Sequence, residues 1–273
     1  MSETKQQLIR EIEPLWSRYI HEKGNALGLP VSGSFELTPR CNFNCKMCYV
    51  HQTAEQVAAS GRREMTADQW LDIARQAKDA GMVFLLLTGG EPLLFPEFPR
   101  LLHELKQMGL LVSVNSNGSL IRGELLETLK KDPPLRFNIT LYGGSDAAYE
   151  RLCGRPAFHQ VVDNIRALKE AGISVRLNAS ITPYNKDDVQ DIFRIGRELG
   201  VHVKSTTYMF PPVRINGGEA GRADHRFSPA DAARYELLCR EQTMTEKQLR
   251  EAVKNGGLPP DGEECTGGAE GEP

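Results

Sequence analysis

The sequence predicts an α/β fold built on a parallel β-sheet, first because one kind of junction recurs along the chain. A helical pattern ends, a glycine follows, and an apolar run begins in the segments 78–87, 106–114, 169–177 and 197–205. Glycine just past a helix is a typical left-handed cap, and an apolar, β-rich run is typical of a buried strand. The spacing repeats: Gly81 and Gly109 are as far apart as Gly172 and Gly200. Repeated strand–helix units follow from this pattern.

Strands and helices alternate along the chain in the order that this pattern predicts. Strands are expected at 33–39, 82–88, 110–116, 135–142, 174–181 and 202–209. An amphipathic helix at 4–22 precedes them, and helices are expected between them at 67–80, 97–108, 121–131, 159–171 and 187–199. The helix at 67–80 has a capping box, Thr66 with Gln69. Such alternation implies parallel pairing through right-handed crossovers, in an open doubly wound sheet or in a whole or partial barrel.

The chain divides into a core with two different flanks. Residues 1–30 form a helical lead-in, 31–226 the core, 227–254 a C-terminal helix and 255–273 a flexible tail of mainly Gly, Pro and Glu. The C-terminal helix opens with Ser228 as N-cap and Pro229 in the first helical position.

Composition narrows the classes of function. With a net charge of −3 and a pI near 6.1, the chain has no basic footprint for nucleic acid or an anionic membrane. Its longest apolar runs, such as 82–90, are too short to span a bilayer, and residues 1–16 lack the apolar segment of a signal peptide. The expected compartment is the cytoplasm. There, six cysteines point to metal binding or catalysis rather than to disulfides.

Three cysteines, Cys41, Cys45 and Cys48, follow the first strand within one short segment. A structural zinc site would need a fourth ligand, which His51 could supply. Alternatively, three thiolates hold an iron–sulfur cluster that keeps one iron open for another ligand. The other unusual segments, 88–92, 115–118 and 141–152, also follow strands, so all four loops are expected to meet at the carboxyl edge of the sheet.

Residues 33–210 resemble the radical S-adenosylmethionine (SAM) superfamily. Two motifs carry this resemblance: C-x3-C-x2-C after the first strand, and Gly-Gly-Glu-Pro (89–92) after the second. The resemblance implies an α/β partial (β/α)6 TIM-like barrel with an N-terminal helix and a C-terminal helical extension. It also implies a 4Fe–4S cluster on Cys41, Cys45 and Cys48, whose open iron chelates SAM. Reductive cleavage of SAM would then yield a 5′-deoxyadenosyl radical that abstracts a substrate hydrogen.

The resemblance also assigns SAM contacts. Gly89, Gly90 and Glu91 would contact the methionine amino group, whereas a tight turn alone would explain the glycines but not the acid. Tyr49 would lie against adenine, although a lone aromatic residue also suits a core.

Further SAM contacts come from later strands, and the same resemblance implies them. Ser116 and Asn117 would reach the ribose, or else form a plain turn. Arg151 would lie near the SAM carboxylate, or else on a solvated helix face, and Asn178 is a further candidate. Tyr142-Gly143 replaces the Asp-Gly that the family commonly has, so no catalytic residue is assigned beyond the cluster.

The remaining cysteines suggest the subfamily. Cys153 and Cys239 fit buried helix positions, whereas Cys265 in "CTGG" resembles the start of the SPASM extension of peptide- and sulfatase-maturing enzymes. The sequence therefore indicates a maturase truncated at that extension, with a peptide or protein substrate and a flavodoxin or ferredoxin as reductant. The alternatives are a zinc-clipped binding module and a truncated, catalytically weak cluster-binding protein.

Overall fold

A computed structural model of the protein describes residues 16–50, 52, 54–61, 63–209 and 225–254. One six-stranded, wholly parallel sheet organises it, with the strands in sequence order from β1 to β6. The strands are β1 Ser32–Glu36, β2 Phe84–Thr88, β3 Leu111–Ser116, β4 Arg136–Thr140, β5 Val175–Ser180 and β6 Val203–Thr206. This sheet confirms the predicted α/β fold with six parallel strands.

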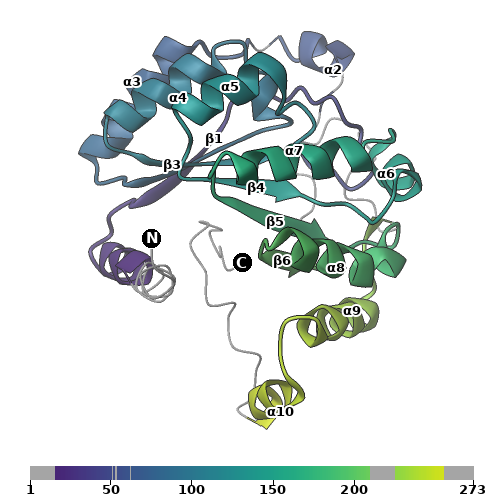
Figure 1. Ribbon diagram of the computed structural model, residues 1–273. Coiled ribbons are helices and arrows are strands. Elements are labelled where there is room, and N and C mark those ends of the chain that lie inside the picture. The colour runs from purple at the N-terminus through teal and green to yellow at the C-terminus, as the bar shows by residue number, and fades with distance from the viewer. Residues whose placement is uncertain (1–15, 51, 53, 62, 210–224, 255–273) are drawn as a thin grey trace.

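The described helices lie mostly on one face of the sheet. They are α2 Ala54–Ala59, α3 Ala67–Asp79, α4 Phe98–Gln107, α5 Gly123–Lys131, α6 Asp146–Cys153, α7 Phe158–Glu170, α8 Val189–Leu199, α9 Pro229–Glu241 and α10 Glu246–Lys254. Residues 16–26 form a further helix before β1. In Figure 1 the sheet curves, α3, α4, α5, α7 and α8 follow its convex side, and the first helix and α9 lie near its two ends. No helix in the described part of the chain is both long and apolar enough to cross a bilayer.

Alternate residues of each strand point into the core between sheet and helices. In β4, Phe137 and Ile139 are fully buried there, and Leu177 of β5 joins them. The residues between them, such as Asn138 and Asn178, therefore face the concave side. The junction glycines Gly81, Gly109, Gly172 and Gly200 all have positive φ, as the cap interpretation requires.

Three helical features differ from the sequence prediction. The short helix α2 was not expected, and α6 begins within the segment 141–152 that was interpreted as a functional loop. Where one C-terminal helix was expected over 227–254, there are two, α9 and α10, because the capping residue Thr245 starts a new helix. Residues 4–15 of the predicted first helix lie outside the described residues.

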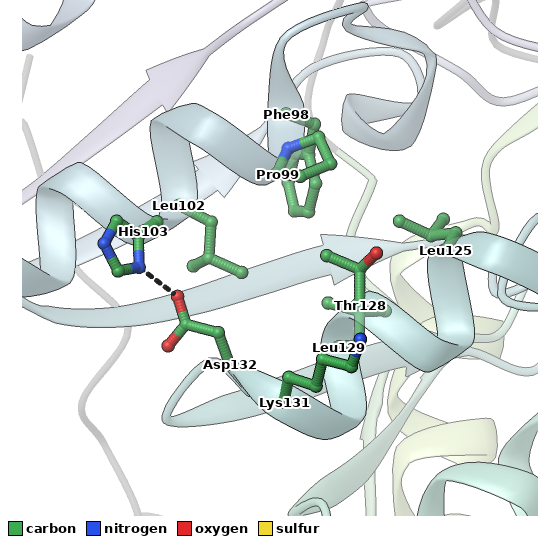
Figure 2. Close-up of a pocket in the computed structure, with 9 residues that line it drawn as sticks. All are labelled: Phe98, Pro99, Leu102, His103, Leu125, Thr128, Leu129, Lys131 and Asp132. Carbon is green, nitrogen blue, oxygen red and sulfur yellow. Dashed lines mark hydrogen bonds and ion pairs between the residues drawn. The ribbon is translucent and has the colours of Figure 1, made fainter.

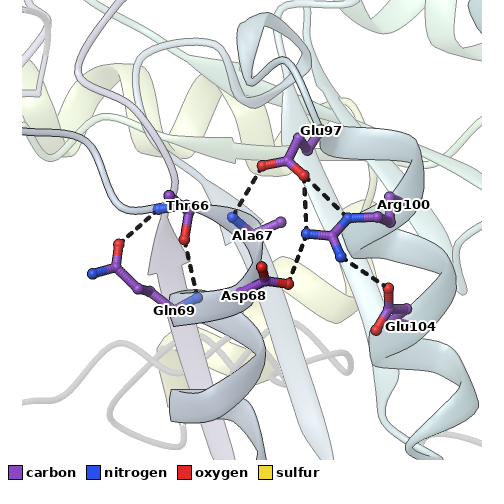
Figure 3. Close-up of polar contacts among 7 residues, drawn as sticks. All are labelled: Thr66, Ala67, Asp68, Gln69, Glu97, Arg100 and Glu104. Carbon is purple, nitrogen blue, oxygen red and sulfur yellow. Dashed lines mark hydrogen bonds and ion pairs between the residues drawn. The ribbon is translucent and has the colours of Figure 1, made fainter.

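The capping box of α3 is formed as predicted, and Figure 3 shows both of its hydrogen bonds. The Gln69 amide donates to Thr66 Oγ1 at 3.3 Å, and the Thr66 amide donates to Gln69 Oε1 at 2.9 Å. Glu97, just before α4, accepts from the Ala67 amide at 3.3 Å. The start of α3 is thus tied to the start of α4.

Thr66→Ala is expected to lower the free energy of unfolding by about 1 kcal/mol, since the Gln69 amide loses its acceptor. Urea unfolding measures this change. Thr245→Ala is the matched control, because it removes the same type of cap from α10, which packs beside α9 at the periphery. An equal loss in both variants would contradict the view that the cap of α3 is part of the cooperative core.

Candidate functional site

The four predicted loops meet at the carboxyl edge of the sheet, held together by hydrogen bonds. The backbone before the cysteines, residues 37–40, lies against Gly89–Glu91. The Gly90 amide donates to the Thr38 carbonyl at 2.7 Å, and the Glu91 amide donates to the Arg40 carbonyl at 2.8 Å. The two glycines permit this approach: a Cβ on Gly90 would lie 2.3 Å from the Arg40 carbonyl oxygen. The Gly-Gly-Glu segment is therefore a support for the loop that carries the cysteines.

The Arg40 side chain reinforces the same junction. Its guanidinium donates to both carboxylate oxygens of Glu64, each at 2.8 Å, and Thr38 Oγ1 donates to Glu64 at 2.5 Å. Burial raises the pKa of Glu64, but these hydrogen bonds outweigh that effect and hold the pKa below its usual value. Such a bidentate pair fixes orientation as well as charge, and it stands directly before Cys41. Glu64 gave no sequence signal of this role.

Glu91 is fully buried at the centre of the carboxyl edge. One oxygen accepts from the Ser116 hydroxyl at 2.8 Å and the Leu93 amide at 3.1 Å, and the other accepts from the Asn117 amide at 2.8 Å. Burial raises the pKa of Glu91 to about 7, although these hydrogen bonds oppose the shift. Both carboxylate oxygens thus connect the end of β2 to the end of β3, and contact with SAM stays a prediction.

A network of short polar side chains links the cysteine loop to the end of β3. Asn117 Nδ2 donates to Asn42 Oδ1 at 2.8 Å, and Asn42 Nδ2 donates to Ser119 Oγ at 2.8 Å. Ser119 Oγ donates in turn to Asn117 Oδ1 at 2.7 Å, which closes the ring. Asn42 and Ser119 were not among the predicted site residues, because their partners are far away in sequence.

The C-terminal end of α6 anchors the other side of the cysteine loop. The Asn44 amide donates to the Cys153 carbonyl and the Lys46 amide to the Leu152 carbonyl, both at 3.0 Å. These carbonyls are free at the end of a helix, so they can accept from another segment. Phe43, Met47 and Val50 alternate with the cysteines along the loop and are buried. The loop is therefore packed on its apolar side and presents Cys41, Cys45 and Cys48 together.

The three thiols are free of disulfides and half-buried. Burial raises the pKa of Cys41, and neighbouring Glu91, Cys45 and Cys48 raise it further. Two donors reach its sulfur: the Phe43 amide at 3.4 Å and Asn117 Nδ2 at 3.8 Å. Hydrogen bonds to ligand sulfurs are one way in which proteins tune iron–sulfur clusters. Soft thiolates with such donors fit a cluster.

Cys45 lies beside a further thiol, that of Cys153. Hydrogen bonding to the buried thiol of Cys153 and burial raise its pKa, while a hydrogen bond with Tyr142 opposes them. Among the described residues, no three His, Cys, Asp or Glu side chains are placed to bind a single metal ion. A cubane does not need that convergence, because it assigns each thiolate to a different iron.

The other predicted SAM residues are placed as follows. Tyr49 is 44% exposed and follows Cys48 directly. Arg151 forms an ion pair with Asp188 at 3.2 Å, which holds it at the α6 side of the edge. Asn178 lies level with Thr140 and Lys204 on the concave face. None of these positions tests a contact with SAM, and His51 and Cys265 lie outside the described residues.

A cavity of about 210 Å³ lies away from this edge, between α4 and α5. Figure 2 shows that mainly apolar side chains line it, with His103 and Asp132 hydrogen-bonded at its rim. None of the predicted site residues lines it, so it is separate from the loops that carry the chemistry.

The sequence profile of the radical SAM superfamily matches residues 35–196, which hold both the cysteine motif and the Gly-Gly-Glu segment. The chain belongs to the radical SAM superfamily. It is accordingly an enzyme of a family that uses a 4Fe–4S cluster and SAM, which confirms the predicted cofactors and disfavours the zinc-clipped module.

Curated relatives include enzymes of several kinds. The AdoMet-dependent heme synthase of Methanosarcina barkeri is 27% identical over 202 residues, which cover 74% of this chain and 55% of that protein. The sporulation killing factor maturation protein SkfB of Bacillus subtilis is 30% identical over 205 residues, covering 69% and 48%. The chain spans about half the length of the curated relatives it matches.

Solved structures confirm the fold. The crystal structure of Streptococcus suis SuiB bound to its precursor peptide SuiA aligns with 82% of this chain and 49% of SuiB. The TM-score is 0.63 at 18% identity. This radical SAM chain therefore has the α/β architecture that the cysteine and Gly-Gly-Glu motifs implied.

Proposed function

We propose that Cys41, Cys45 and Cys48 bind the 4Fe–4S cluster and that the adjoining carboxyl edge of the sheet binds SAM. The observation that carries this proposal is the double anchoring of the cysteine loop, on Gly89–Glu91 at one side and on the end of α6 at the other. With cluster and SAM bound, reductive cleavage of SAM supplies a 5′-deoxyadenosyl radical for hydrogen abstraction from the substrate.

The chain's own residues position and shield these groups. Glu91 holds Ser116 and Asn117 at the end of β3, and Asn117 reaches both the cysteine loop and the Cys41 sulfur. The candidate contacts to SAM remain Gly89, Gly90, Glu91, Tyr49, Arg151 and Asn178, with Ser116 and Asn117 toward the ribose. Phe43 and Met47 exclude water from the inner side of the loop.

The proposed substrate is a peptide or protein side chain. The similarity to SkfB, a maturation protein, and the shared fold with SuiB, which was solved with a precursor peptide, support a peptide substrate. A flavodoxin or ferredoxin is the proposed reductant. Short peptides encoded beside the gene are the test substrates, and a mass change that requires SAM and reductant would identify the modification.

Anaerobic reconstitution tests the cluster assignment. The wild-type chain is expected to bind about four iron atoms, to show the broad visible absorbance of a cluster, and to release 5′-deoxyadenosine from SAM under dithionite. Cys41→Ala, Cys45→Ala and Cys48→Ala are each expected to lose the absorbance and the cleavage. Cys239→Ala is the matched control, because Cys239 is a buried thiol in α9 that the proposal leaves out.

Two results would contradict the proposal. One tightly bound zinc ion per chain, with no cluster after reconstitution, would favour a zinc-clipped module. An intact cluster that never cleaves SAM would favour the catalytically weak cluster-binding protein.

A further inference from the structure

Two side chains that the proposed function leaves without a role lie against the sulfur of Cys45. Tyr142 follows the end of β4, and Cys153 is the last residue of α6. The side chain of each is hydrogen-bonded to the Cys45 thiol. The Cys45 sulfur thus meets a phenol and a second thiol, which come from two different elements.

Tyr142 is held in place through its backbone and its ring. Its amide donates to the Tyr149 hydroxyl at 3.4 Å, and its carbonyl accepts from Asn185 Nδ2 at 2.9 Å. Its ring packs edge to face with the ring of Tyr149, which is fully buried, at a centroid distance of 5.8 Å and an interplanar angle of 84°. These contacts fix the ring, so they also fix the direction of the hydroxyl toward Cys45.

Cys153 is tied to the cysteine loop through both its backbone and its side chain. Its carbonyl accepts from the Asn44 amide at 3.0 Å, while its buried thiol contacts the side chain of the next loop residue, Cys45. Both thiols are free of disulfides. The hydrogen bond between the backbones therefore keeps the two sulfurs together.

Binding of iron decides which partner donates at this contact. A thiolate bound to iron carries no hydrogen, so its sulfur can only accept hydrogen bonds. The phenol of Tyr142 keeps its proton at neutral pH, and the thiol of Cys153 is a weak donor. With iron on Cys45, both side chains would therefore donate to its sulfur. Two donors reach the sulfur of Cys41 in the same way.

We propose that Tyr142 and Cys153 donate hydrogen bonds to the cluster-bound sulfur of Cys45 and thereby raise the reduction potential of the cluster. The inference rests on the proposed function, because it takes Cys45 as a cluster ligand. One electron from the reductant adds negative charge that the ligand sulfurs share. A donor at such a sulfur stabilises the reduced form more than the oxidised form. Both residues act through Cys45, so they are positioning residues rather than catalytic ones.

A redox titration of the reconstituted chain without SAM tests the inference, with dithionite as reductant and electron paramagnetic resonance to count reduced clusters. At the midpoint potential of the wild-type cluster, Tyr142→Phe is expected to lower the ratio of reduced to oxidised clusters about tenfold, which corresponds to about 59 mV for one electron. Cys153→Ala should lower the ratio about threefold, because a thiol is the weaker donor. Cys153→Ser keeps a donor and should keep the wild-type ratio.

Tyr149→Phe is the matched control. It also removes a buried phenol hydroxyl beside Tyr142, but the hydrogen bond of that hydroxyl is to the Tyr142 amide, so the ratio should stay close to the wild-type value. An unchanged ratio in Tyr142→Phe would overturn the inference, as would equal falls in Tyr142→Phe and Tyr149→Phe.

Two further comparisons keep the inference open to refutation. If Tyr142→Phe does not retain iron, the two Cys153 variants decide, and equal ratios in Cys153→Ala and Cys153→Ser would overturn the role of the donor. Iron content reports on the proposed function separately. A wild-type chain without a cluster would contradict the cluster assignment, whereas an intact cluster whose potential is the same in every variant would contradict only the hydrogen bonds to Cys45.

Discussion

Gly90→Ala is expected to destabilise the chain by about 3 kcal/mol and to abolish cluster retention. The new Cβ would lie 2.3 Å from the Arg40 carbonyl oxygen and 2.7 Å from that of Pro39. Both neighbours are backbone atoms, so no side-chain rotation relieves the overlap. The segment before Cys41 must move away, and the hydrogen bonds from Gly90 to Thr38 and from Glu91 to Arg40 are then lost. Urea unfolding of the metal-free chain and iron content after reconstitution measure the two effects.

Two other glycines separate the causes of this loss. Gly109 has a φ of 86° but no atom within 4 Å of an added Cβ, so Gly109→Ala carries only the conformational cost, about 1 kcal/mol, and should retain iron. Gly89 has a φ of 136° and would place a Cβ 2.5 Å from the Thr38 carbonyl oxygen, so Gly89→Ala combines both costs. If Gly109→Ala and Gly90→Ala lost equal stability and equal iron, the steric explanation would be wrong.

The contacts of Gly90 show what a sequence motif can and cannot reveal. The apolar runs, the glycines that end the helices and the regular distance between those glycines predicted all six strands, because each of these signals is local in sequence. The positive φ of Gly81 and Gly200 follows from the same local reasoning. The sequence also predicted that the cysteine loop and Gly89–Glu91 lie at one edge, because parallel strands end on the same side.

The contacts within that edge could not be predicted in the same way. Asn42, Ser119 and Glu64 take part through partners on other loops, and no periodic pattern indicates which distant side chain each one meets. The sequence likewise did not predict the helix α6, whose last carbonyls accept hydrogen bonds from the Asn44 and Lys46 amides. Tertiary contacts of this kind depend on the exact placement of loops, which local propensity does not determine.

For Glu91, the sequence motif and the structure point to different roles. Its motif implied a contact to SAM, whereas the structure shows a buried carboxylate with three protein donors. Glu91→Ala is expected to destabilise the metal-free chain by about 4 kcal/mol, because a cavity forms and the donors from Ser116, Asn117 and Leu93 lose their acceptor. Ser113→Ala is a matched control on β3, since Ser113 is half-buried on the concave face and is not one of the three donors to Glu91. A loss below about 1 kcal/mol in Glu91→Ala would contradict this structural role.

The pH dependence of stability gives a second test of Glu91. Burial raises its pKa from 4.5 to about 7, so between these values the folded chain holds a proton that the unfolded chain has released. Stability from this group is therefore complete below pH 4.5 and falls as the pH rises toward 7, by a total of about 3 kcal/mol. Glu91→Gln cannot ionise, and its amide group would face the Asn117 amide, so it should be less stable at low pH yet lack this fall. The difference in unfolding free energy between wild type and Glu91→Gln, measured from about pH 5 to about pH 8, isolates the contribution of Glu91 from those of other titrating groups. Parallel pH profiles for the two proteins would show that Glu91 is already ionised in the folded chain at pH 5, and that its three hydrogen bonds outweigh its burial.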